Sequence, residues 1–303
     1  VCGDVFASPT VDAVLSGILA VSGPAGCLLI VKNYTGDRLN FGLAAERARA
    51  YGIKVAMVIV DDDIALPHLP QARGVAGTLF VHKIAGAMAE TGADLDKVCD
   101  AAKRVIDNVC SIGMSLDTCT VPGSPKEDRI EAGKAELGLG IHGESGVELV
   151  DFISARNAFS LVMERLKPHV GQGPFVAMLN NLGGTTPLEM ALLAEELTQS
   201  DIIENIQYLI GPAPLMTSLD MRGFSVSLMP VNNNDLALLQ SPVDIAAWPG
   251  CRIIEAPLVH PIPDGLTPIK PIPSQDPATA LFIENCCDAF IEAESTLNAL
   301  DAQ

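Results

Sequence analysis

Two short and fully apolar runs, Cys27–Val31 and Val55–Val60, most constrain how this chain can fold. Runs of this kind are typical of strands in a parallel sheet that is covered on both faces. A helical pattern over residues 37–51, ended by Gly52, separates the two runs, so a βαβ unit is predicted. Ligands bind beyond the carboxyl ends of strands in such sheets, which makes the loop after Val31 a candidate binding position.

Weaker patterns extend this organisation along the chain. Ser8-Pro9 predicts a helix start, because proline is tolerated in the first turn. Further helices are expected over residues 78–91, 95–114, 151–167 and 187–199. Further strands are expected over residues 116–121, 137–141, 175–179 and 224–230.

The predicted fold class is α/β, with four parts in order. We expect an N-terminal α/β domain over residues 1–112, already in progress at its start, and a second α/β domain over residues 113–250. Frequent prolines predict an extended linker over residues 251–277. Residues 278–303 follow the cap pair Asp276-Pro277 with apolar residues at helical spacing, and look like the first helix of a further domain. Because the chain opens on valine, we expect it to be the interior of a longer polypeptide.

Composition excludes several classes of protein. A hydrophobic content of 49% with 18% charged residues supports a packed core rather than disorder. A net charge of −18 would repel phosphate, so no nucleic-acid surface is expected. The uncharged stretch 13–31 is interrupted by turn residues 22–26, and no secretory signal opens the chain, so no membrane association is expected. Eight cysteines without a C-x-x-C pair indicate a reduced compartment, and we predict a cytoplasmic protein.

The stretch Glu136–Gly146 carries the strongest chemical signal, because it places His142 among glycine, aliphatic and acidic residues. Leu137, Leu139 and Ile141 alternate with small residues, which predicts a short strand that ends at this histidine. Two interpretations stay open at this point. His142 is either a core histidine bonded to a main-chain carbonyl or a catalytic histidine that reacts covalently.

Lys32 and Asp37 flank the predicted strand-to-helix turn. Asp37 could cap its helix while Lys32 is solvated, or Asp37 could take a proton from a substrate hydroxyl while Lys32 holds an oxygen. Ser8 is expected to be a helix N-cap, with a ligand contact as the alternative. His82 is expected to be a packed or interface histidine. No histidine pair has metal-ligand spacing and no nucleotide-binding glycine motif occurs, so no metal site is predicted in this chain.

Five short sequence blocks follow one another between residues 2 and 224. They are CGDVFASP at residues 2–9, VKNYTGDRLNF at 31–41, ELGLGIHGESG at 136–146, NNLGG at 180–184 and SLDMRGF at 218–224. Together they resemble the dihydroxyacetone (glycerone) kinase family. The resemblance implies the family's ketone-binding unit, which is built from two α/β domains and is usually a homodimer. Residues 278–303 resemble the first helix of the family's all-α nucleotide domain.

The resemblance also implies roles for the candidate residues. In the family, the histidine that His142 matches attacks the substrate carbonyl and forms a covalent hemiaminal. Asp37 matches the base that takes the proton from the attacking hydroxyl. Lys32 and Ser8 resemble groups that position the substrate, which is dihydroxyacetone or another short carbonyl sugar. Ser145 departs from the family pattern, where proline is usual.

Two family elements are not in this sequence. A glycine-rich loop with a second substrate-contacting histidine would lie upstream of Val1, and a G-D-G-D magnesium motif would follow Leu300-Asp301. ATP and Mg²⁺ are therefore expected to bind the helical domain and not this segment. The 303 residues alone are expected to be inactive as a kinase.

The linker fused to a helix indicates the single-chain, ATP-dependent form of the family, similar to triokinase/FMN cyclase. Relatives that depend on the phosphotransferase system carry the nucleotide subunit on a separate chain. Single-chain members also phosphorylate glyceraldehyde, and animal members cleave FAD to cyclic FMN. A ketone-binding regulatory relative that transfers no phosphate is a second alternative, since Lys32, Asp37 and His142 fit both.

Overall fold

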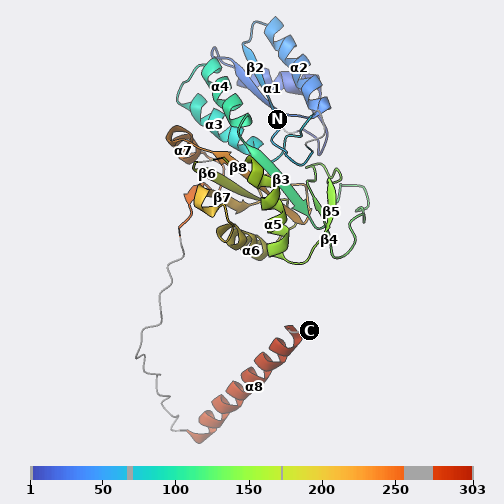
Figure 1. Cartoon of the computed structure of the whole chain (residues 1–303), viewed down its shortest axis with the longest axis vertical. Helices are drawn as coiled ribbons and strands as arrows, with labels where there is room; N and C mark the ends of the chain where they lie inside the picture. The colour runs from blue at the N-terminus through green and yellow to red at the C-terminus, as the bar shows by residue number, and fades with distance from the viewer. Residues whose placement is uncertain (1–2, 67–70, 172, 256–275, 302–303) are drawn as a thin grey trace. The chain divides into compact units, whose positions relative to one another are not determined.

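The computed structural model describes residues 3–66, 71–171, 173–255 and 276–301, and the chain divides into two compact units, Val1–Glu255 and Ala256–Gln303. The first unit contains two sheets and the helices that cover them (Figure 1). This arrangement confirms the predicted α/β class. The domain boundaries expected at residues 112, 250 and 277 stay predictions.

The predicted βαβ unit forms a two-stranded parallel sheet. β1 (Cys27–Lys32) pairs along its whole length with β2 (Val55–Val60). Four helices surround the pair, namely α1 (Val11–Val21), α2 (Thr35–Ala50), α3 (Thr78–Glu90) and α4 (Leu95–Ile106). α1 and α2 cover one face, whereas α3 and α4 cover the other. Both faces of the strands are thus covered, which explains why β1 is apolar up to Val31 and β2 is apolar throughout.

The second sheet has seven strands in the order β5–β4–β3–β8–β6–β7–β9. The strands are β3 (Cys110–Ser115), β4 (Lys134–Leu137), β5 (Glu148–Asp151), β6 (Phe175–Asn181), β7 (Ile206–Ala213), β8 (Gly223–Pro230) and β9 (Cys251–Ile253). Its further helical elements are α5 (Ala155–Leu166), η1 (Lys167–His169), α6 (Pro187–Thr198), η2 (Ile203–Asn205) and α7 (Asn233–Gln240). α5 and α6 pack on one face, and α7 packs with α3 and α4 on the other. α3 and α4 therefore join the two sheets into one core.

Two sequence predictions around β3 are wrong. The helix expected over residues 95–114 ends at Ile106, and the described residues 116–121 form no strand. The strand of this region is β3, in which every residue is buried. β3 reads Cys-Ser-Ile-Gly-Met-Ser, so its apolar residues alternate with small ones as in a strand, but this pattern follows so closely on the helical pattern of α4 that the boundary between them is hard to place.

Two further elements begin or end elsewhere than expected. The strand predicted over residues 137–141 is β4, which ends at Leu137 because Gly138 adopts a φ of 71°. The helix predicted over residues 151–167 begins at Ala155, where the Ser154 hydroxyl accepts from the main-chain N–H of Asn157. The elements expected near α3, α6, β6 and β8 are confirmed.

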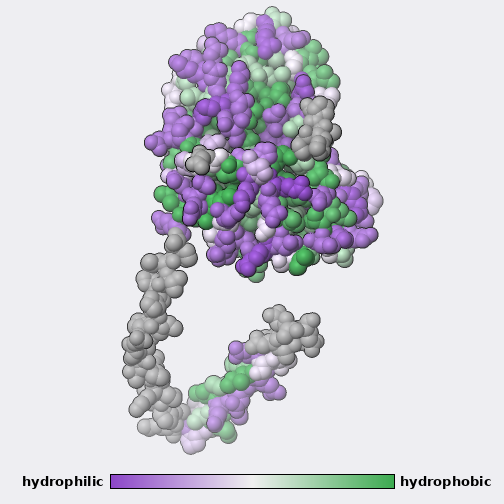
Figure 2. Space-filling view, in the orientation of Figure 1, coloured by the Kyte–Doolittle hydropathy of each residue, from purple (hydrophilic) through white to green (hydrophobic). Residues whose placement is uncertain are grey.

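The described part of the second unit is the helix α8 (Pro277–Asp301). The Asp276 carboxylate accepts from the main-chain N–H of Thr279 at 3.2 Å, which confirms the predicted cap. Large apolar side chains of α8 are exposed, among them Phe282 and Phe290 (Figure 2). Residues 256–275 of the predicted linker and the side chain of Asp301 lie outside the described part. Neither α8 nor any other described helix is long and apolar enough to cross a membrane.

Candidate active site

One cavity of about 440 Å³ brings together all four residues that the sequence singled out. Lys32 ends β1, and Asp37 lies in the first turn of α2. Ser8 precedes α1, and His142 lies in the loop after β4. The cavity thus lies at the carboxyl end of β1, where the sequence predicted a ligand position.

Lys32 and Asp37 form one wall of this cavity. Tyr34 is the N-cap of α2 and makes no side-chain capping bond, so the interpretation of Asp37 as a cap is wrong. A carboxylate in the first turn is favoured by the positive end of the helix dipole. Lys32 is half-buried rather than solvated, because a Cβ at Gly74 would lie only 2.8 Å from the Lys32 Cβ. Burial lowers the pKa of the Lys32 ammonium, while Asp37 and Asp62 oppose this shift.

Ser8 belongs to a segment that is fastened to α2. The expected role of Ser8 as an N-cap is wrong. Thr10 is the N-cap, because its hydroxyl accepts from the Ala13 N–H and α1 begins at Val11. The Asn40 side-chain amide donates to the Pro9 carbonyl at 2.8 Å. The Ser8 side chain is therefore exposed and available at the cavity.

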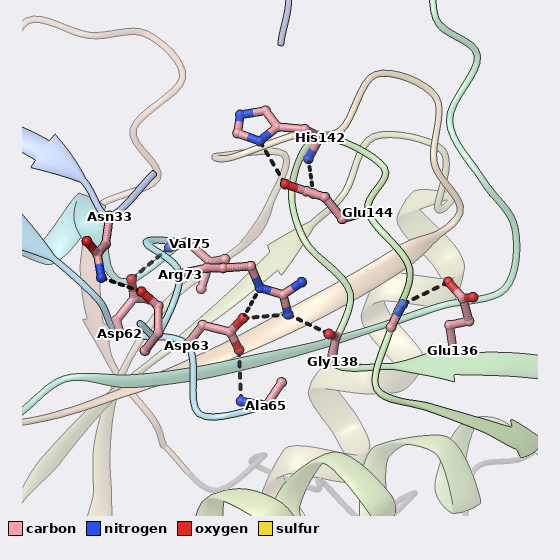
Figure 3. A network of polar contacts seen from close by, with 12 residues as sticks. Asn33, Asp62, Asp63, Ala65, Arg73, Val75, Glu136, Gly138, His142 and Glu144 are labelled. Carbon is pink, nitrogen blue, oxygen red and sulfur yellow. Dashed lines mark hydrogen bonds and ion pairs between the residues drawn. The ribbon is translucent and has the colours of Figure 1, made fainter. Parts of the chain in front are cut away.

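His142 is held in one orientation by three side chains. Its Nδ1 lies 3.1 Å from Glu144 Oε1, and its main-chain N–H donates to Glu144 Oε2 at 2.9 Å (Figure 3). The rings of Tyr34 and Phe6 meet the imidazole edge-on, with centroid distances of 4.6 and 5.4 Å. The ring partner is a carboxylate, so the interpretation as a core histidine bonded to a main-chain carbonyl is wrong. The His142 side chain is 29% exposed.

Glu144 determines which nitrogen of His142 can react. Burial alone would raise the pKa of this carboxyl, but the hydrogen bonds from the His142 ring and main chain outweigh it and bring the pKa to about 2. Glu144 is therefore ionised and accepts the Nδ1 proton. We assign this tautomer from the hydrogen bond, and it leaves the Nε2 lone pair free as a nucleophile.

Glycines allow Glu144 to fold back under the histidine. A Cβ at Gly140 would overlap Glu144 Oε2. Gly143 adopts a φ of 81°, and its Cβ would lie 3.0 Å from Cys119 Sγ. A side chain at either position would displace the carboxylate or the loop.

Several residues of the site were missed in the sequence. Glu144 could have been found, because an acid two residues after a histidine in a glycine loop can reach its ring. Phe6 and Arg73 carry no comparable signal, because their contacts depend on the tertiary fold. Tyr34 lies in the sequence block at residues 31–41, but the sequence indicated no role for it. Its hydroxyl is buried without a partner among the described residues, and burial together with Glu144 raises the pKa of Tyr34 above its usual range.

His82 also lines the cavity, although the sequence predicted a packed or interface side chain. Its ring reaches solvent at the cavity rim, yet the protein around it removes enough water to lower its pKa, and the charge of Lys32 lowers it further. Among the described residues, no group of three or more histidine, cysteine or acidic side chains could hold a metal ion.

Residues 1–247 match the family model of the Dak1 domain. The chain belongs to the dihydroxyacetone kinase family. It is 42% identical to the dihydroxyacetone kinase of Citrobacter freundii over 100% of this chain and 55% of that protein. It is 38% identical to the triokinase/FMN cyclase of Bos taurus over 99% of this chain and 56% of that protein. The crystal structure of the C. freundii kinase in complex with AMP-PNP and Mg²⁺ has a TM-score of 0.85 and 43% identity, and the match covers 99% of this chain and 56% of that one.

The chain spans about half the length of these two dihydroxyacetone kinase relatives. A third relative is the dihydroxyacetone-binding subunit of a PTS-dependent dihydroxyacetone kinase from Listeria innocua. It is 39% identical over 82% of this chain and 78% of its own length. This share corresponds in length to the Dak1 domain, whereas the two longer relatives match the chain almost to its full extent.

Proposed function

We propose that this chain is the ketone-capturing part of an ATP-dependent dihydroxyacetone kinase. The observation that carries the proposal is the orientation of His142 by an ionised Glu144, in the same cavity as Lys32 and Asp37. A nucleophile, a base and a cation around one small cavity are the parts that carbonyl capture and phosphoryl transfer need.

Capture begins when Nε2 of His142 attacks the carbonyl carbon of dihydroxyacetone. A carbon–nitrogen bond forms, and the π electrons of the carbonyl move to its oxygen, which takes up a proton from solvent. The positive charge that develops on the imidazole is stabilised by the negative charge of Glu144, which is hydrogen-bonded to Nδ1. The product is a hemiaminal. Glycerol has no carbonyl, so it cannot be captured in this way.

Transfer then uses the wall formed by Lys32 and Asp37. Asp37 takes the proton from a terminal hydroxyl of the captured ketone, and the Lys32 ammonium holds an oxygen of the reacting group. ATP with Mg²⁺ supplies the phosphoryl group. We assign their binding to the helical domain that α8 would begin, as the family resemblance implies. A related crystal structure contains AMP-PNP and Mg²⁺. The side chain of Asp301 lies outside the described part and is given no role.

The length of the matches favours the single-chain form. The relatives that match nearly all of this chain are a dihydroxyacetone kinase and a triokinase/FMN cyclase, whereas the PTS-dependent subunit matches a Dak1-sized share. Dihydroxyacetone is the proposed substrate, with glyceraldehyde as a second one. The homodimer remains a prediction from the family resemblance, and the cytoplasmic location remains a prediction from the cysteine pattern.

The proposal is tested in two steps. Native mass spectrometry of the chain with dihydroxyacetone should show a covalent adduct that His142→Ala abolishes. The full-length gene product should then consume ATP with dihydroxyacetone, whereas the 303-residue chain alone should not. An adduct that survives in His142→Ala would reject the role of His142. Capture by the full-length product without any ATP consumption would instead support the ketone-binding regulator.

A further inference from the structure

Arg73 connects the loop that carries His142 to Asp63, in the segment that follows β2 (Figure 3). Its guanidinium donates to Asp63 Oδ2 at 2.7 Å and to the Gly138 carbonyl at 2.6 Å. Gly138 is the residue at which the His142 loop leaves β4. The Arg73 and Asp63 side chains are only 11% and 3% exposed, so solvent screens this ion pair little. The pair therefore fixes one end of the His142 loop.

The segment around Arg73 is fastened to the opposite wall of the cavity. The Asn33 side-chain amide, next to Lys32, donates to the Ala72 carbonyl at 2.7 Å. Gly74 lies against Lys32, where a Cβ at Gly74 would come within 2.9 Å of the Lys32 Cα. Arg73 lies between these two anchored residues. Its side chain thus spans from the Lys32 wall to the His142 loop.

The rest of the His142 loop has separate supports. The hydroxyl of Ser218, which is fully buried, donates to the Ile141 carbonyl at 2.8 Å. Glu144 bonds the main chain and the ring of His142 from within the loop. Neither of these supports reaches the Lys32 wall. Arg73 bonds the first residue of the loop, and its neighbours Ala72 and Gly74 contact Asn33 and Lys32.

Resting on the proposed function, we propose that Arg73 is a positioning residue that sets the distance between the two walls. It holds the His142 loop so that a ketone captured on Nε2 presents its terminal hydroxyl to Asp37. Arginine suits this task because its planar fork bonds two acceptors in a fixed geometry, whereas a lysine ammonium on a flexible stem does not.

The inference predicts that capture and transfer separate in Arg73→Lys. The imidazole is still oriented by Glu144, and Ser218 still holds Ile141, so the adduct should form at nearly the wild-type level. The captured ketone would be misplaced relative to Asp37, so kcat in the full-length gene product should fall about 10- to 100-fold. The KM for dihydroxyacetone should change far less than kcat.

The experiment measures adduct formation and kcat in the full-length gene product for wild type, Arg73→Lys and a matched control. The control is Lys134→Met, which removes one partner of the exposed ion pair with Asp151. Because Asp63 could destabilise the fold when it loses a full partner, the double variant Asp63→Asn with Arg73→Gln is measured as well. A fall in kcat with retained adduct, in either variant and not in the control, supports the inference.

Two results would overturn the inference. Wild-type kcat in both Arg73 variants would show that the bonds of Arg73 to Asp63 and Gly138 do not matter for phosphoryl transfer. An equal loss of adduct and kcat would show that Arg73 merely maintains the loop. Failure of the proposed function is distinguishable from both, because wild-type protein would then form no adduct with dihydroxyacetone.

Discussion

The two walls of the cavity are built by different means. Lys32 and Asp37 follow from local structure, since β1 ends at Lys32 and α2 begins at Thr35. The described residues 138–147, in which His142 lies, contain no helix or strand. This wall is shaped by glycines and by side chains that reach it from distant segments, such as Arg73 and Ser218.

The difference teaches where substitutions should act. A wall made by a parallel strand and a helix end keeps its backbone when one side chain is replaced, so the chemistry of that side chain can be removed alone. A loop held by a few bonds changes shape when one of them is lost. We therefore expect Lys32 and Asp37 to control phosphoryl transfer, and His142 with Glu144 to control capture. Arg73, which connects the two walls, should act on transfer through the distance between them.

The largest effect short of removing His142 is expected at the first wall. Asp37→Asn should leave capture intact and slow phosphoryl transfer about 100-fold or more, because the variant lacks a general base. The measurement is kcat with ATP beside native mass spectrometry of the adduct. Glu46→Gln, on the exposed face of the same helix, is the control. Undiminished turnover in Asp37→Asn would assign the base to another residue.

A smaller effect is expected at Glu144, and it concerns the rate of ketone capture. Glu144→Gln keeps the size of the side chain but removes the charge that faces Nδ1 of His142. A hydrogen bond to a charged group contributes ~1.5–3 kcal/mol, so capture should slow about 10- to 100-fold. Stopped-flow mixing with dihydroxyacetone, compared with the exposed Glu131→Gln, measures this. If capture kept its rate and only transfer slowed, the assignment of the two walls would be reversed.

How much of the site could be predicted follows from the same comparison. The apolar runs of β1 and β2 predicted the position of the turn that carries Lys32 and Asp37. A strand that is buried on both faces is apolar at every position, and such a run is easily found in a sequence. The strand was predicted to begin at Leu137, the residue at which β4 ends, since the sequence does not show that Gly138 adopts a positive φ. Phe6 reaches His142, and Arg73 reaches Gly138 at the start of its loop, only through tertiary folding. Sequence patterns singled out the four cavity residues and the family resemblance supplied their roles, but neither indicated the side chains that orient them.

The smallest effect is a pH dependence of stability. The pKa of Glu144 lies at about 2 in the folded chain, against an ordinary 4.5. A depressed carboxyl pKa stabilises the fold above 4.5, and this contribution is lost as the pH falls from 4.5 towards 2. The stability difference between wild type and Glu144→Gln, from urea unfolding, should therefore shrink over this range. A difference that stays constant with pH would mean that Glu144 is not held by His142 in solution.

The central claim is that His142 captures the ketone through Nε2, and nuclear magnetic resonance tests it most directly. The chain is labelled with nitrogen-15 at histidine, and dihydroxyacetone with carbon-13 at its carbonyl carbon. The account predicts that the carbonyl signal moves to the tetrahedral range and couples through one bond to Nε2 of His142. A carbonyl signal that is unchanged by the protein, or a coupling to any other nitrogen, would contradict it.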